Sequence, residues 1–109
     1  MAIAQKIVGQ SAPSSTTETT LYTVPARTST VINGLVACNR GGTATTFRVS
    51  VHVGGASTAN KDYIYYDVPI AAYDSFYSTI PIAMNQGDVI RVYAGNGNMS
   101  FTAFGTETL

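Results

Sequence analysis

Residues 45–53 read TTFRVSVHV, and this stretch decides the fold class. Apolar and polar side chains alternate along it: Phe47, Val49, Val51 and Val53 are separated by Arg48, Ser50 and His52. Alternation of period two places the apolar set on one face of a β-strand and the polar set on the other. We therefore expect the apolar face to point into a core and His52 to point to solvent.

The same alternation continues on both sides of this strand. The expected inward positions are Ile64, Tyr66 and Val68; Phe76, Ser78, Ile80 and Ile82; Ile90, Val92 and Ala94; and Met99, Phe101 and Ala103. Turn-forming residues separate the runs, at 39–42, 54–55, 85–88 and 96–98, and they are rich in Gly and Asn, which accept positive φ. Short strands separated in this way are typical of a sandwich or barrel.

Residues 30–39 break the strict alternation, because apolar residues fall on both parities around Asn33 and Gly34. A β-bulge at these two residues would let both halves of the strand face the core. With a further strand near 19–24, the chain is predicted to be all-β. We expect an antiparallel two-sheet β-sandwich of about eight strands, jelly-roll or Greek-key like, without long helices.

The first 18 residues differ from the rest. Residues 11–20 are polar and contain Pro, which is typical of a linker. Before them, Ile3, Ile7 and Val8 are too few to form a core but enough to contact a neighbouring protein. The sequence thus predicts an extended N-terminal arm and linker over residues 1–18, with these three residues as partner-binding anchors, and a β-sandwich domain over residues 19–109.

Composition limits the partners. The chain of 109 residues carries six basic and six acidic residues and has a formal net charge of zero. So few Lys and Arg residues leave no basic stripe for nucleic acid or for an anionic membrane surface, so we expect neither partner. No segment reaches the roughly 18 apolar residues of a membrane span, and no signal sequence is recognisable. Weak charge repulsion between copies favours a role in a protein assembly.

The single Cys38 is expected to act as a small buried hydrophobe.

Catalytic chemistry has few candidates in this sequence. His52 is the only histidine, so a Ser-His-Asp triad would have to include it, and no nucleophile motif supports one. One His and one Cys cannot build an ordinary zinc site. The aspartates at 62, 67, 74 and 88 are candidates for a glycosidase pair or a calcium site, but most of them stand beside turns, where carboxylates commonly accept backbone N–H bonds. We expect no catalytic, cofactor-binding or metal-binding residues, and hence no enzyme.

Tyrosine is unusually frequent in this sequence: it supplies seven aromatic residues against four Phe, and Trp is absent. If Ile64 and Tyr66 point inward, Tyr63 and Tyr65 point outward and are predicted to bind a partner. Such a strip belongs to a protein interface or a sugar-stacking platform, or it is half-buried under a loop.

Several strand sequences resemble the small β-sandwich virion proteins of tailed bacteriophages, in particular cyanophage-like ones. The stretches that carry the resemblance are Leu21–Ala26, Val36–Asn39, Thr46–Val49, Asn60–Ile70, Asp88–Ala94 and Phe101–Glu107, within residues 19–107. The resemblance implies a head decoration (cement) protein: a homotrimer that binds between major capsid protein subunits on the capsid surface of the virion, after synthesis in the host bacterial cytoplasm. The alternative is a tail-fibre or baseplate-associated module that recognises a host surface glycan or another tail protein.

Overall fold

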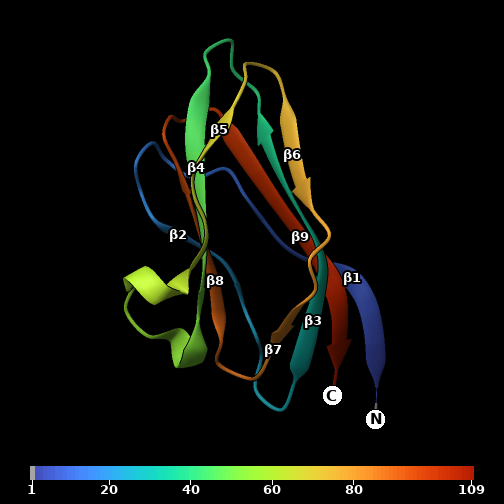
Figure 1. Ribbon diagram of the computed structural model, residues 1–109. Helices are drawn as coiled ribbons and strands as arrows, with labels where there is room; N and C mark the ends of the chain where they lie inside the picture. Colours follow the sequence, from blue (N-terminus) through green and yellow to red (C-terminus); the bar gives the residue numbers. More distant parts are fainter. Residues whose placement is uncertain (1) are drawn as a thin grey trace.

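The computed structural model describes residues 2–109 (Figure 1). The described chain forms nine strands and two short 3₁₀ turns. The strands are β1 (Ile3–Ser11), β2 (Thr19–Thr23), β3 (Ser29–Asn39), β4 (Thr45–His52), β5 (Tyr63–Ile70), β6 (Ser75–Ser78), β7 (Ile82–Met84), β8 (Val89–Ala94) and β9 (Met99–Thr108), and the turns are η1 (Val53–Gly55) and η2 (Asn60–Asp62). The predicted all-β class is confirmed.

Two antiparallel sheets pack face to face. The five-stranded sheet has the order β1-β9-β3-β6, with β7 also paired to β3, and the four-stranded sheet has the order β2-β8-β4-β5. The first and last strands are therefore neighbours, and most successive strands alternate between the sheets. This is the strand order of a jelly roll, so the β-sandwich expectation is confirmed with this topology.

Strand β1 belongs to the sandwich. Residues 3–11 pair with β9 over its whole length, from Ile3 opposite Thr108 to Ser11 opposite Phe101. These residues were predicted to form an arm outside the domain, with the boundary at residue 18, but in the structure residues 3–11 form an edge strand of the sandwich. The partner strand lies at the other end of the chain, so nothing in the local sequence of residues 1–18 reveals the pairing.

The core lies between the sheets, as the alternation predicted for β4, β8 and β9. Its fully buried residues include Phe47, Val49, Ile90, Val92, Ala94, Met99, Phe101 and Ala103. Outside β5, two expected core residues are exposed instead: Val53 lies in the η1 turn, and Ile80 lies in the break between β6 and β7. Alternation cannot locate the end of a strand, and both errors fall at strand ends.

The predicted bulge at Asn33 and Gly34 is confirmed, because the register of β3 against β9 shifts between Ile32 and Gly34. The Phe104 ring lies over Gly34, where a Cβ atom would come within 2.3 Å of it. Glycine is therefore required here for close approach. Cys38 is half-buried, paired with Ser75 and Ser100 on the outward side of β3, rather than buried in the core.

Candidate functional site

The predicted anchors Ile3 and Ile7 lie on the outside of the five-stranded sheet. Their side chains are 65% and 58% exposed. Ile7 is opposite Phe104 of β9, which is itself exposed. Val8 differs, since it sits in a register shift of β1 and packs against the core. Ile3 and Ile7 thus remain available to a partner, whereas the Val8 side chain is not.

The outward positions of β1, β3, β6, β7 and β9 form one surface, here called the outer sheet face. Its apolar members are Ile3, Ile7, Val31, Val36, Tyr77, Ala83 and Phe104, and its polar ones are mostly Thr, Ser, Asn and Gln. The two charged residues on these strands, Lys6 and Glu107, have the inward parity and pair with each other at 2.7 Å. The outer sheet face therefore combines apolar with neutral polar side chains and has no charged residue at an outward position.

Strand β5 does not follow the predicted alternation. Tyr65 was expected outside, but it packs against the core, and its hydroxyl donates a 2.7 Å hydrogen bond to Ser78 of the opposite sheet. Ile64 and Tyr66 were expected inside and are 44% and 57% exposed. Tyr63, the other predicted partner-binding tyrosine, is half-buried on the outside against the Tyr66 ring. The prediction was therefore wrong for three of the four residues.

Register shifts explain this reversal. Tyr65 is opposite Val49 and Val68 is opposite Phe47, so Tyr66 and Asp67 together face the single residue Arg48. In such a β-bulge, two residues of one strand lie opposite a single residue of the partner strand. Asp67 adopts φ of 48°, a left-handed conformation that Asp tolerates better than most residues. This inserted residue reverses the facing of Tyr65, and a second register shift, between Tyr65 and Tyr63, returns Tyr63 to the outside.

The bulge builds a cluster on the outside of the four-stranded sheet, here called the aromatic platform: Arg48, Asp67, Tyr63, Tyr66 and Tyr93. The Arg48 guanidinium lies over the Tyr66 ring at 4.3 Å and over the Tyr93 ring at 4.4 Å. Tyr93 is the neighbour of Arg48 across β8. Such cation–π contacts hold rings and guanidinium in one arrangement.

Asp67 completes the platform by accepting two hydrogen bonds from Arg48, at 2.7 Å from Nε and 3.4 Å from Nη2. These bonds raise the pKa of Arg48 above its usual value. The Tyr63 ring meets the Tyr66 ring at 4.8 Å and 80°. Asn60, Tyr63 and Tyr66 line a shallow hollow there. Tyr66, Tyr93 and Arg48 were not predicted as site residues, because the pairing of β4 with β8 places Tyr93 beside Arg48 and the bulge in β5 adds Tyr66.

His52 is fully buried, contrary to the expectation of a solvated side chain. It does lie on the outward face of β4, but the segment from η1 to η2 covers that face (Figure 1). Arg91, on the neighbouring strand β8, donates hydrogen bonds to the carbonyl oxygens of Ala56 and Gly55 in this segment. The segment is thus clasped to the sheet by polar contacts, which residue alternation cannot reveal.

The clasp brings a serine, a histidine and a carboxylate into line. Ser50 Oγ is 2.7 Å from His52 Nε2, and His52 Nδ1 is 3.5 Å from Asp62 Oδ2. Nδ1 is closer to the Ala56 carbonyl oxygen, at 3.0 Å, and Ser50 is only 2% exposed. A serine nucleophile must reach its substrate. In this closed arrangement His52 bonds Ser50 and the Ala56 carbonyl, Asp62 bonds the Ala59 N–H, and these bonds hold the covering segment in place.

The carboxylates beside turns accept hydrogen bonds from backbone N–H groups, as predicted from their positions in the sequence. Asp62 accepts from Ala59, Asp74 accepts from Ser75, and Asp88 accepts from Gly54 and Asn85. The bond from Ala59, with one from Lys61, lowers the pKa of Asp62. Among residues 2–109, no three His, Cys, Asp or Glu side chains gather as metal ligands would.

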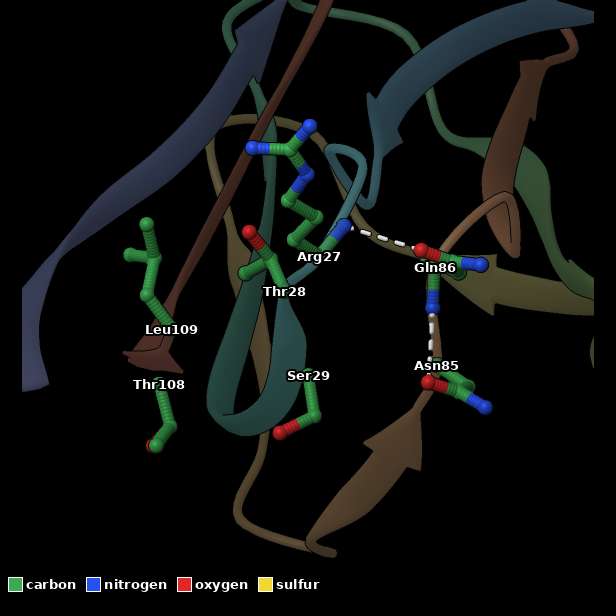
Figure 2. Close-up of a pocket in the computed structure, with 7 residues that line it drawn as sticks. All are labelled: Arg27, Thr28, Ser29, Asn85, Gln86, Thr108 and Leu109. Atoms are coloured by element: carbon green, nitrogen blue, oxygen red, sulfur yellow. Dashed lines mark hydrogen bonds between the residues drawn. The ribbon is translucent and has the colours of Figure 1, made fainter. Parts of the chain in front are cut away.

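A second hollow lies at the end of the sandwich near the C-terminus. Figure 2 shows its lining, from Arg27, Thr28, Ser29, Asn85, Gln86, Thr108 and Leu109. The Gln86 side chain accepts a 2.8 Å hydrogen bond from the Arg27 backbone and so fixes the two loops to each other. The Thr28 and Asn85 side chains also bond within these loops, and the lining includes no Asp, Glu, His or Cys side chain.

In comparisons with known proteins, no protein-family model, curated protein or solved structure matches the chain. The described residues also include no helix that is long and apolar enough to span a membrane.

Proposed function

We propose that the protein is a structural subunit of a tailed-phage particle, a decoration protein that binds between major capsid subunits as a homotrimer and stabilises the head. The observation that carries an assembly role is the outer sheet face. A broad face without charge buries against another protein without the desolvation cost of unpaired ions. Ile3, Ile7 and Phe104 supply exposed apolar area at its β1 edge.

Two further arguments support the proposal. The strand sequences resemble phage virion proteins, and jelly rolls are common in viral capsids, an analogy of fold that says nothing about individual residues. A subunit that binds only the assembled shell stabilises it by mass action, and many copies multiply a modest contact. Neutral charge and rigid β structure suit such a role.

The first test is the number of copies in purified particles, measured on a quantitative gel. A decoration protein is expected in hundreds of copies, and a tail component in a few dozen or fewer, by the symmetry of the two structures. Absence of the protein from the particle would overturn the proposal.

A second test addresses the face. Purified protein is added to heads that lack it, and binding is compared for Ile3→Glu, Ile7→Glu and the control Val53→Glu, which places the same charge on an exposed residue of the η1 turn. We expect both isoleucine variants to bind at least about tenfold more weakly, because each buries an unpaired carboxylate. Equal binding by all three would show that the outer sheet face is not the contact.

The alternative, a tail-fibre or baseplate-associated module that recognises a glycan or another tail protein, is favoured by one observation, the aromatic platform. The platform is compatible with a place in the head or in the tail. Copy number is therefore the measurement that separates the two roles.

A further inference from the structure

We infer that the aromatic platform is a binding site for a neutral sugar ring. This inference goes beyond the structural role proposed above, and it applies to a head protein and to a tail protein alike.

Tyr66 supplies the surface on which a sugar would lie. Its side chain is 57% exposed and borders the hollow that Asn60 and Tyr63 also line. The Arg48 guanidinium covers one face of this ring at 4.3 Å and the Tyr63 ring meets it at 4.8 Å, so a sugar would lie on the part of the ring that stays exposed. A ring already fixed in place loses little conformational entropy on binding. The electron-rich face of a tyrosine attracts the slightly positive C–H groups on the apolar side of a sugar.

Polar groups that could bind the hydroxyls of a sugar lie beside the Tyr66 ring. Arg48 has five N–H donors, of which two bind Asp67, so three remain. The Asp67 side chain is 44% exposed, and its oxygens can accept further bonds. The Asn60 side chain is exposed and also lines the hollow, so its amide can donate and accept bonds. Donors and acceptors are thus both available beside one exposed ring.

Charge argues for a neutral ligand. Asp67 lies 2.7 Å from Arg48 and compensates its charge, so a phosphate or carboxylate would meet a carboxylate as well as a guanidinium. Lys61, the other nearby cation, is bound to Asp62 at 3.1 Å. A purely apolar ligand fits no better, because it would cover donors and acceptors without pairing them. A neutral sugar has both the apolar face and the hydroxyls that the platform requires.

The test is an NMR titration of the full chain with methyl glycosides of glucose, galactose, mannose and N-acetylglucosamine, and with their disaccharides. We expect at least one of them to cause saturable shifts at the Arg48 Nε–H signal and in residues 60–67. Tyr66→Ala should weaken that affinity by about tenfold, whereas Tyr66→Phe, which keeps the ring, should remain within about threefold of the parent protein. The matched control is Tyr77→Ala, another exposed tyrosine on the opposite sheet, and it should not change the affinity.

Several results would overturn the inference. One is the absence of shifts at the platform with every sugar of the panel, and another is unchanged affinity in a folded Tyr66→Ala variant. Inorganic phosphate that shifts the same signals when no sugar does would identify an anion site instead. If Tyr66→Ala weakens attachment to particles while no sugar binds, the platform is a protein contact and the sugar assignment is wrong, although the proposed role in the particle would stand.

Discussion

The Tyr22 hydroxyl donates a 2.6 Å hydrogen bond to Oε2 of Glu107 and so connects the two sheets through the interior of the sandwich. Glu107 also pairs with Lys6 at 2.7 Å, and Thr30 is 2.7 Å from the same hydroxyl. Burial, followed by the bond to Glu107, raises the pKa of Tyr22 to about 12. The bonds from Lys6 and Tyr22 lower the pKa of Glu107. Four strands, including β1, therefore meet at one buried carboxylate.

Removal of the hydroxyl should destabilise the fold. Tyr22→Phe leaves a buried Glu107 with one partner fewer, at a cost of roughly 1 to 3 kcal/mol in the free energy of unfolding. Urea denaturation measures this loss. The exposed Tyr77→Phe serves as the control and should stay within about 0.5 kcal/mol of the parent protein. Equal stability of both variants would mean that the Tyr22 to Glu107 bond contributes nothing.

Acid should weaken the protein through the same carboxylate. Glu107 and Asp62 both have pKa values lowered by folding. Their contribution is therefore complete above the unfolded pKa values, about 4, and is lost as the pH falls through the folded values. Urea denaturation between neutral pH and about pH 3 should show this decline. In Glu107→Gln the stability should be lower at neutral pH and should fall less steeply in acid; an unchanged slope would contradict the assignment.

His52→Ala should be costly, because the histidine is buried and bonded. We expect a loss of roughly 1 to 3 kcal/mol from the hydrogen bonds to Ser50 and the covering segment. A solvated histidine would give about 0.5 kcal/mol or less. Thermal or urea unfolding distinguishes the two, with Val53→Ala as a control in the exposed turn beside it. A loss no larger than that of the control would show that the segment does not cover His52 in solution.

Val49→Asp is expected to abolish folding. Val49 is fully buried at the centre of β4, and an unpaired carboxylate there costs several kcal/mol against a total stability of roughly 5 to 15. Circular dichroism and solubility report the outcome. Soluble protein with a cooperative melting transition would show that the face assignment of β4 is incorrect.

Deletion of residues 1–11 should lower the melting temperature strongly or prevent folding. It removes β1, leaves the β9 edge unpaired, and takes away Lys6, a partner of buried Glu107. A shorter deletion of residues 1–2, before the strand begins, is the control. If the long deletion melts like the full chain, β1 is dispensable and residues 1–18 act as the arm that the sequence suggested.

Much of the fold could be predicted from the sequence. Alternation in 45–52, 90–94 and 99–103 identified core strands correctly, and Asn33 with Gly34 marked a real bulge. The candidate sites were predicted less well. Ile3 and Ile7 are exposed as expected, but Tyr65 and Val8 are not, and the best-organised polar and aromatic cluster was missed.

The sequence by itself determined the fold class, because side-chain alternation and turn residues are local properties that need no knowledge of the partner strand. Only the tertiary structure decided that β1 pairs with β9, that the bulge at Tyr66 and Asp67 turns both toward Arg48, and that the segment after β4 covers His52. These features depend on which distant strand lies alongside and on a shift of one residue in register. Residue alternation does not reveal which strand lies alongside. A register shift of one residue reverses the face on which each side chain is predicted to lie.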